Sequence, residues 1–290
     1  MNTASTPAHV EPAVPPETES VGALVHLALA EDIGRGDLTT EATVRANSVA
    51  VAEIRQKQAG VVCGLPIVER VFQAFDDQVV VTPLVAEGSW GDQRVVARIA
   101  GPTRAILSGE RTALNFLARL SGVATLSRQV AEAVAETQVR VLDTRKTTPG
   151  HRVLEKYAVR VGGCHNHRAG LDDGMLIKEN HIRAAGGITA AVSAALRRTA
   201  PMQNVEVEVT TLAELDEAIA AGVQVVLFDN ADLDSLRAAV ARAAGRVRLE
   251  ASGGVTLDTV QAVARTGVDY VSLGALTHSA GSLDFSLILL

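Results

Sequence analysis

The chain contains few cysteines and few aromatic residues. Cys63 and Cys164 are the only cysteines in 290 residues, and no CxxC spacing occurs. Two cysteines cannot build a disulfide framework, so we expect reduced thiols and a cytoplasmic protein. Aromatic residues make up 3% of the sequence, whereas 47% of it is hydrophobic. Aliphatic side chains must therefore form the core, which is large enough for one large or two medium domains.

The sequence also lacks long apolar runs and an excess of positive charge. No run is long enough to cross a bilayer, and residues 1–19 lack the basic and apolar regions of a secretory signal. Four prolines in this stretch favour a disordered arm. The net charge of −6 argues against nonspecific binding to nucleic acid. We expect neither a membrane nor a nucleic acid as a partner, although a locally basic pocket remains compatible with this total.

Residues 20–120 are predicted to form a first domain that mixes helices and strands. Helical periodicity begins at Val21 and recurs over 66–75, and polar residues 34–40 predict a turn. Two further helices are expected between 103 and 136, separated at Ser121-Gly122. The expected strands, in an antiparallel or mixed sheet, cover 49–54, 60–64, 78–81 and 94–101.

Residues 121–278 alternate strands with helices, which implies parallel pairing with right-handed crossovers. No Rossmann fingerprint is present, so an α/β barrel is favoured, with an open doubly wound sheet as the alternative. We expect the tail, 279–290, to pack back on the first domain as a strand or helix. The expected strands are 139–142, 175–178, 205–209, 223–228, 247–250 and 268–273, and the helices are 150–161, 188–199, 212–221, 233–244 and 257–265.

Polar residues follow these strands at their carboxyl ends, the edge where parallel α/β folds build sites. They are Asp143 to Lys146, Lys178 to Asn180, Glu208, Asp229-Asn230, Glu250 to Gly254 and Ser272 to Gly274. In "VEVEV" (205–209), alternation places Glu206 and Glu208 on one face. In a barrel these carboxylates would face the lumen and need a partner such as Lys178 or a sugar hydroxyl. The alternative is a solvated edge strand.

Two glycine-containing turns at this edge, "EASGGV" (250–255) and "SLGALTH" (272–278), suggest a phosphate site, although each could be an ordinary tight turn. "EASGGV" (250–255) precedes a helix, so its backbone N–H groups and the helix N-terminus favour an anion. The segment "GGCHNHR" (162–168) directly follows the expected helix 150–161 and contains His165, His167 and Arg168. The two histidines could hold a metal, but an arginine beside a histidine suits an aromatic carboxylate better. From spacing alone, Arg111 is a surface or interface residue.

With these motifs in view, the chain resembles the quinolinate phosphoribosyltransferase family, whose members are also called nicotinate-nucleotide pyrophosphorylases (carboxylating). The resemblance spans nearly the whole chain after the arm and includes "DTRKTTPG" (143–150), "GGCHNHR" and "LFDN" (227–230). Thr210 and Cys164-His165 depart from the common pattern, which leaves fine geometry open. The other matching motifs are "GERTALNFLARLSGVAT" (109–125), "MLIKENH" (175–181), "VEVEV", "EASGGV" and "VDYVSLGALTHS" (268–279).

The resemblance implies an α/β fold with an N-terminal α/β sandwich domain and an incomplete, seven-stranded parallel α/β barrel, of which one strand is not visible to pattern analysis. It implies a glycosyltransferase that moves phosphoribosyl from phosphoribosyl pyrophosphate (PRPP) to quinolinate, with decarboxylation, in NAD biosynthesis. Mg²⁺ is the implied cofactor, held through pyrophosphate by unknown protein ligands. A homodimer with a shared active site is also implied, with further assembly into a hexamer left open.

Residue roles follow from the matching positions. For quinolinate the resemblance implies Arg111 from the partner subunit, Arg145, His167, Arg168 and Lys178. For the phosphates and ribose of PRPP it implies Thr144, Lys146, Glu208, Asp229, Ser252, Gly253, Gly254 and Gly274. Glu208, Asp229, Lys146 and Lys178 would be catalytic. The alternatives are a paralogue with another substrate, a lyase or aldolase using Lys178 as a Schiff-base amine, and a non-catalytic sensor of phosphorylated metabolites.

Overall fold

The structure is a computed structural model that describes residues 16, 18–200 and 202–290. It divides into two compact units. The first comprises the chain up to Arg128, together with 147–163 and 279–290, and the second comprises 129–146 and 164–278. Most of the expected arm lies outside the described residues. Glu19, however, begins the first helix, and Thr18 is the N-cap of that helix.

The first unit contains a four-stranded antiparallel sheet in the order β12-β1-β5-β3. Its last strand comes from the tail, which pairs with β1 from Ala52↔Leu289 to Gln56↔Phe285. The sequence "EGSWGD" (87–92) is typical of a glycine-bracketed loop, but Trp90–Gly91 within it form β4, which pairs with β2 (Gly60–Val61) in a separate two-stranded ribbon. The strands of the larger sheet are β1 (Val49–Gln56), β3 (Val80–Pro83), β5 (Arg94–Pro102) and β12 (Phe285–Leu289).

Five helices of the described chain begin in this unit: α1 (Glu19–Ile33), α2 (Leu38–Thr43), α3 (Leu65–Phe75), α4 (Thr103–Ala133) and α5 (Arg152–Gly162). Helix α2 lies partly where a turn was expected, because Asp37 caps it by accepting a hydrogen bond from the Thr40 N–H at 3.0 Å. Helix α4 is continuous, so the expected break at Ser121-Gly122 is wrong. A Cβ at Gly122 would collide with the Gly281 carbonyl, and the glycine therefore permits close approach of the tail.

The second unit contains six parallel strands in the order β6-β11-β10-β9-β8-β7. Consecutive strands β7 to β11 are neighbours, and β6 pairs with β11, so the order winds in one direction. A doubly wound sheet would reverse, and that alternative is excluded. The strands are β6 (Arg140–Leu142), β7 (Met175–Ile177), β8 (Val205–Val209), β9 (Val225–Asp229), β10 (Arg248–Ser252) and β11 (Tyr270–Ser272).

A seventh strand is absent from the described part of this unit, which corrects the implied strand count. In its place His165 forms a single parallel bridge with Leu142 on the outer edge of β6. The His165 N–H donates to the Val141 carbonyl at 2.8 Å, and the Asp143 N–H donates to the His165 carbonyl at 3.0 Å. The incomplete barrel therefore has six strands and one bridge.

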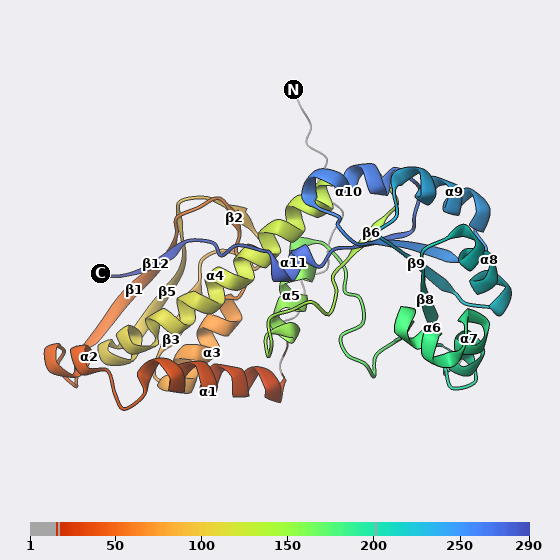
Figure 1. The fold of residues 1–290 in the computed structure, drawn as a ribbon. Coiled ribbons are helices and arrows are strands. Elements are labelled where there is room, and N and C mark those ends of the chain that lie inside the picture. The colour runs from red at the N-terminus through yellow and green to blue at the C-terminus, as the bar shows by residue number, and fades with distance from the viewer. Residues whose placement is uncertain (1–15, 17, 201) are drawn as a thin grey trace, which may run out of the picture. The chain divides into compact units, whose positions relative to one another are not determined.

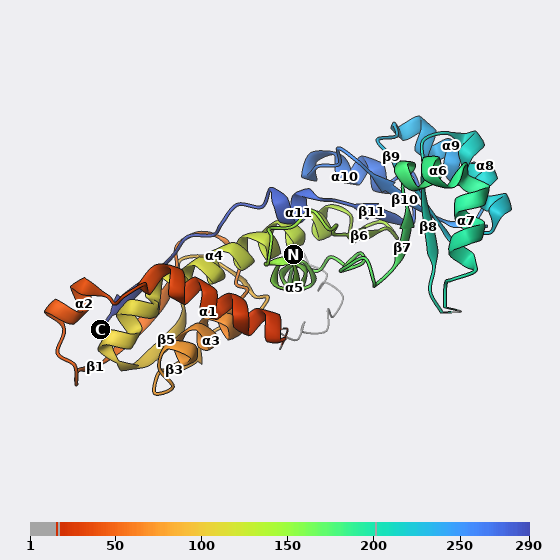
Figure 2. The same cartoon turned by 60° about the horizontal axis from the view of Figure 1, so that its bottom comes forward.

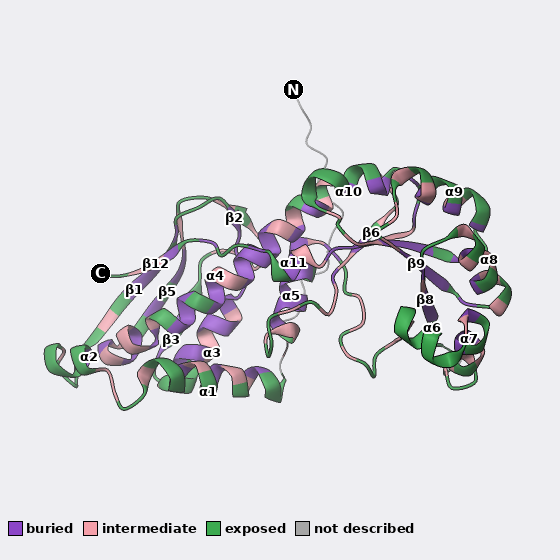
Figure 3. Cartoon of the chain, in the orientation of Figure 1, coloured by how far each residue is buried: buried purple, intermediate pink, exposed green. Residues whose placement is uncertain are grey.

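Helices flank the outer side of the parallel sheet, as Figures 1 and 2 show for α7 to α10. The strands β8 and β9 are purple along most of their length in Figure 3 because their valines, Leu227 and Phe228 are buried. None of the described helices is both long and apolar enough to span a membrane. The helices are α6 (Glu179–Ala185), α7 (Ile188–Leu196), α8 (Leu212–Ala221), α9 (Leu233–Ala243), α10 (Leu257–Ala264) and α11 (Ala275–His278).

The expected domain boundaries, 20–120 and 121–278, differ from these units. Because α4 runs on through Gly122, residues 121–128 stay with the first unit. Helix α5, expected as the first barrel helix, also belongs there, and the chain returns to the second unit at Cys164. In the described chain, the second unit therefore has no helix of its own between β6 and the single bridge at His165.

Candidate active site

The glutamates of β8 lie on the inner side of the sheet in the second unit. Strand β8 lies between β7 and β9, so the solvated-edge alternative is wrong. Lys178 directly follows β7 and begins α6, and its Nζ lies 2.8 Å from Glu208 Oε2. The expected pairing of a strand-end lysine with a β8 carboxylate is therefore present.

Asp143, which the sequence did not single out individually, holds the segment 164–168 beside β6. This carboxylate is fully buried. Its Oδ2 accepts a hydrogen bond from Asn166 Nδ2 at 2.6 Å, and its Oδ1 accepts the His167 N–H at 2.8 Å. Charge-assisted bonds of this kind fix the backbone before His167 and Arg168, two of the expected site residues.

Arg145 and Arg168 bring two guanidinium groups close together, and we call them the arginine pair. Burial lowers the pKa of Arg168, and so does the charge of Arg145, while Glu206 raises it. Arg168 Nη1 donates to the Gly174 carbonyl at 2.9 Å. Arg145 Nε is buried and has no hydrogen-bond partner. Two repelling cations with an unused donor are suited to a ligand that carries two negative charges.

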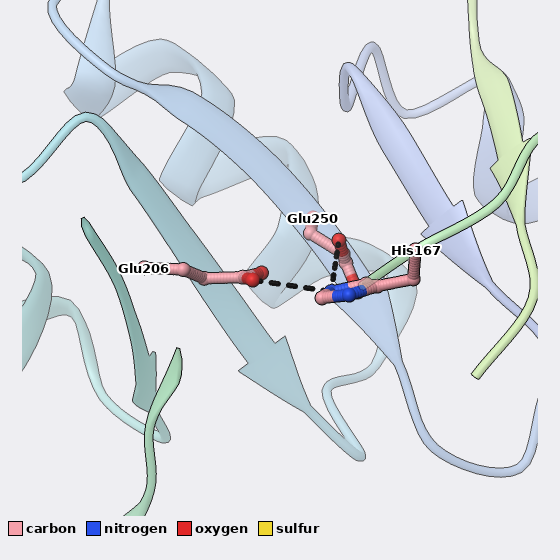
Figure 4. A group of neighbouring side chains, drawn as sticks. All are labelled: His167, Glu206 and Glu250. Atoms are coloured by element: carbon pink, nitrogen blue, oxygen red, sulfur yellow. Dashed lines mark ion pairs between the residues drawn. The ribbon is translucent and has the colours of Figure 1, made fainter. Parts of the chain in front are cut away.

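Both ring nitrogens of His167 are engaged within the protein, and Figure 4 shows the two ion pairs that Nε2 makes. Nδ1 accepts the Arg168 N–H at 2.7 Å, so the ring proton is on Nε2. Nε2 lies 3.1 Å from Glu206 Oε2 and 3.7 Å from Glu250 Oε2. The three side chains are close enough to hold a metal ion, but an Nε2–H has no lone pair for one. His165, the other histidine of the metal alternative, is not in this group.

Glu250 is the most deeply buried carboxyl group of this cluster. Burial raises its pKa to about 8, and the charge of Glu206 acts in the same direction. His167 and a hydrogen bond from Ser272 lower the pKa, but by less. Glu250 is 1% exposed and Glu206 is 7% exposed.

Two turns beyond β10 and β11 have the compact backbone expected of a phosphate site. Gly253 and Gly254 have φ angles of +89° and +63°, and a Cβ on Gly253 would collide with the Asn230 side chain. A Cβ on Gly274 would lie 3.1 Å from Lys146 Cδ. Glycine at 274 thus lets the Lys146 side chain lie against the turn after β11.

The structure brings most of the expected residues to one edge, at the ends of neighbouring strands. Asp229 and Ser252 are register partners at the ends of β9 and β10. Thr144 Oγ1 accepts the Lys146 N–H at 3.0 Å, and Thr277 Oγ1 donates to the Lys146 carbonyl at 2.7 Å. Arg111 is different, because it is exposed on α4 in the first unit.

Known families and structures are similar to this chain over almost all of its length. The family model described as "Quinolinate phosphoribosyl transferase, N-terminal domain" matches residues 37–121, and the corresponding C-terminal domain model matches residues 123–288. A protein of Bacillus subtilis named "Probable nicotinate-nucleotide pyrophosphorylase (carboxylating)" is 45% identical over 89% of each chain. "Quinolinate phosphoribosyltransferase (decarboxylating) 2a, mitochondrial" of Nicotiana tabacum is 38% identical over 99% of this chain and 86% of its own. The solved structure of the nicotinate-nucleotide pyrophosphorylase from Francisella tularensis superposes with a TM-score of 0.89, at 40% identity, over 93% of this chain and 96% of that one.

Proposed function

Because the chain belongs to the quinolinate phosphoribosyltransferase family, we propose that the carboxyl edge of its six-stranded sheet is the active site. The reaction moves phosphoribosyl from PRPP to quinolinate and releases pyrophosphate and CO₂. Its product is nicotinate mononucleotide, a precursor of NAD. Family membership also removes the lyase and sensor alternatives. The observation that carries the proposed location is the arginine pair with its unused buried donor.

Quinolinate binding would relieve the repulsion within the arginine pair. The substrate carries two carboxylates on adjacent ring carbons, and guanidinium groups bind carboxylates through paired N–H donors. Arg145, Arg168 and Lys178 would bind these carboxylates, with Arg111 reaching them from a second copy of the chain. A cluster of fixed cations also offsets the repulsion between a dianion and the polyanionic PRPP.

Glu208 and Asp229 would act on the ribose. The quinolinate nitrogen attacks C1′ while the bond from C1′ to pyrophosphate breaks, so positive charge develops on the sugar. Two carboxylates at neighbouring strand ends, one already bound to Lys178, would orient the ribose hydroxyls and stabilise this charge. The 5′-phosphate would bind at Ser252 to Gly254 and Gly274, with Thr144 nearby.

Oxygen donors at this edge fit a Mg²⁺ ion that arrives with pyrophosphate. Asp229 is half-buried, and its Oδ2 accepts a hydrogen bond from Asn230 Nδ2 at 2.8 Å. A carboxylate is a donor that Mg²⁺ prefers, so Asp229 would hold the ion. When bound, Mg²⁺ neutralises charge on the leaving pyrophosphate. Lys146 would bind the same phosphates from the turn after β6.

Decarboxylation follows from the charge on the new pyridinium ring. Once the ring nitrogen is bonded to C1′, the bond from the adjacent ring carbon to its carboxylate breaks and CO₂ leaves. The electron pair left on that carbon is stabilised by the positive nitrogen and takes up a proton from solvent, which gives nicotinate mononucleotide. No covalent adduct with Lys178 is needed. The described cysteines, Cys63 and Cys164, are buried and form no disulfide bond, which supports a reducing compartment, and we place the enzyme in the cytoplasm.

Mass detection of the product tests this function. The purified full-length protein is mixed with quinolinate, PRPP and Mg²⁺, with each component omitted in turn. Nicotinate mononucleotide should form only in the complete mixture, in equal amount with CO₂ and pyrophosphate. Absence of the nucleotide from a folded sample would contradict the proposed function.

A further inference from the structure

Two buried carboxyl groups converge on a single N–H donor. Glu206 and Glu250 each direct one oxygen at His167 Nε2, at 3.1 and 3.7 Å, from β8 and β10 respectively (Figure 4). Their other oxygens, both named Oε1, are buried and have no hydrogen-bond partner. We call Glu206 and Glu250 the carboxyl pair. This N–H and the hydroxyl of Ser272, which bonds to Glu250, are too few donors for two ionised carboxylates that are buried.

The two carboxyl groups of the pair also hydrogen-bond each other, and such a bond needs a proton on one of them. His167 Nδ1 accepts the Arg168 N–H, so the ring presents its N–H at Nε2 to both carboxyl groups. Two buried carboxyl groups this close together do not both ionise, so one of them keeps a proton. Glu250 is the better candidate because it is more deeply buried than Glu206. Glu206, in contrast, interacts favourably with the charge of Arg168.

We propose that Glu250 is a positioning residue that keeps a proton at neutral pH and, with Glu206, fixes the His167 ring and through it the backbone of Arg168 for binding a dianion. This inference rests on the proposed function. When Glu250 loses its proton, a second negative charge arises near the arginine pair. Affinity for quinolinate should then fall, although Glu250 does not touch the substrate. The raised pKa of Glu250 agrees with this assignment.

The groups around Glu250 leave few other sources for such a pH dependence. Its register partners are Tyr270 on β11 and Leu227 on β9, and Ser272 donates a hydrogen bond to it. Glu206 and His167 face it from β8 and from the segment 164–168, and Arg168 is bonded through its N–H to His167. The charge of Arg168 interacts with those of Glu206 and Arg145. Arg248, two residues earlier on β10, is paired with Asp269 at 2.6 Å.

Calorimetric titration of quinolinate into the full-length protein, without PRPP, tests this role. Between pH 7 and 9 the wild-type Kd should weaken about tenfold, as expected for one proton with a pKa near 8. In Glu250→Gln, which keeps the shape but cannot ionise, the Kd should change by less than about twofold over this range. Asp234→Asn, which removes an exposed carboxylate on α9, is the matched control and should follow the wild type.

A tenfold weakening that persists in folded Glu250→Gln would overturn the proposal. If that variant does not fold, Glu206→Gln provides the test. Without the like charge, Glu250 should ionise about one pH unit lower or more, and the midpoint of the weakening should move with it. An unmoved midpoint in Glu206→Gln would also overturn the proposal.

The pH dependence of Tm, measured without ligand, tests this inference separately from the proposed function. A carboxyl whose pKa is raised on folding binds its proton more tightly in the folded state. Its contribution to stability is therefore complete below the unfolded value of 4.5 and is lost as pH rises toward about 8. Wild-type Tm should fall across this range more than that of Glu250→Gln, whereas equal slopes would refute the proton assignment. Failure to bind quinolinate at pH 7, with this slope difference present, would contradict only the proposed function.

Discussion

Arg145 and Arg168 are the residues whose placement is hardest to explain without a ligand. A protein gains nothing in stability from holding two guanidinium groups together, and the buried Arg145 Nε has no partner. Unsatisfied buried donors cost free energy, on the order of 1–3 kcal/mol each. Such a cost is typical of a site prepared for an anion.

Replacing Arg145 by alanine should lower kcat/KM for quinolinate about 10²-fold or more, a loss on the order of 3 kcal/mol in transition-state binding. The Tm should not fall, because the arginine pair is repulsive. Steady-state kinetics and thermal unfolding measure both effects. Arg237→Ala, at an exposed ion pair on α9, is the control and should keep wild-type kinetics. Near wild-type activity of Arg145→Ala would remove this residue from the site.

At the residue scale, the sequence could predict which types of residue form the site better than it could predict which side chains contact one another. Strand ends and family motifs predicted Arg145, Arg168, Lys178 and Glu208 as site residues, which stays a prediction, and alternation placed Glu206 on the same face as Glu208. The contact of His167 with Glu206 and Glu250 joins segments far apart in the chain. Neither periodicity nor local spacing carries information about such a contact, which depends on the curvature of the sheet.

At the element scale, helix α3 begins at a carboxylate supplied from elsewhere in the chain. Its N-cap residue, Gly64, has no side chain. Glu87 instead accepts the Gly64 N–H at 2.5 Å and the Leu65 N–H at 3.2 Å. Tyr157 of α5 donates its hydroxyl to the same carboxylate at 2.8 Å. Burial raises the pKa of Glu87, so each of these donors matters for keeping it in place.

Tyr157→Phe removes one donor from this buried carboxylate and should lower the free energy of unfolding by about 1–3 kcal/mol. Urea unfolding at pH 7 measures the change. Phe75→Leu, at the exposed end of α3, is a control for loss of apolar area alone. A change below about 0.5 kcal/mol in Tyr157→Phe would show that the hydroxyl does not support the helix start.

Element types could be predicted from the sequence where periodicity was strong, as for the six strands of the second unit. The errors have local physical causes. Gly122 resembled a helix break but serves close packing of the tail, and the Asp37 cap starts α2 within an apparent turn. In place of the implied seventh strand there is one bridge at His165, and a single residue has no alternating pattern that sequence analysis could detect.

At the scale of the whole molecule, the chain crosses between its two units inside one motif. "DTRK" (143–146) belongs to the second unit, and "TTPG" (147–150) belongs to the first. Glu155, fully buried, holds the latter by accepting the Thr148 N–H at 3.0 Å and forming an ion pair with Arg119 at 2.6 Å. Thr148, just after the crossing, is thus bound by Glu155, and Lys146, just before it, is bound by Thr277.

Mixing two inactive variants should test whether Arg111 acts from a second subunit. In a homodimer with shared sites, Arg111→Ala mixed with Lys178→Ala gives mixed dimers in which one of the two sites is intact. Activity should recover to roughly a quarter of wild type, because half of the dimers are mixed. Arg145→Ala mixed with Lys178→Ala is the control and should not recover. No recovery in the first mixture, with mixed dimers present by native mass spectrometry, would contradict the shared site.

A crystal structure of the protein with quinolinate tests the central claim most directly. The account predicts electron density for the ligand at the carboxyl edge of the six-stranded sheet, with its two carboxylates within hydrogen-bonding distance of Arg145, Arg168 and Lys178. Quinolinate bound at another surface, with the arginine pair left without it, would contradict the account.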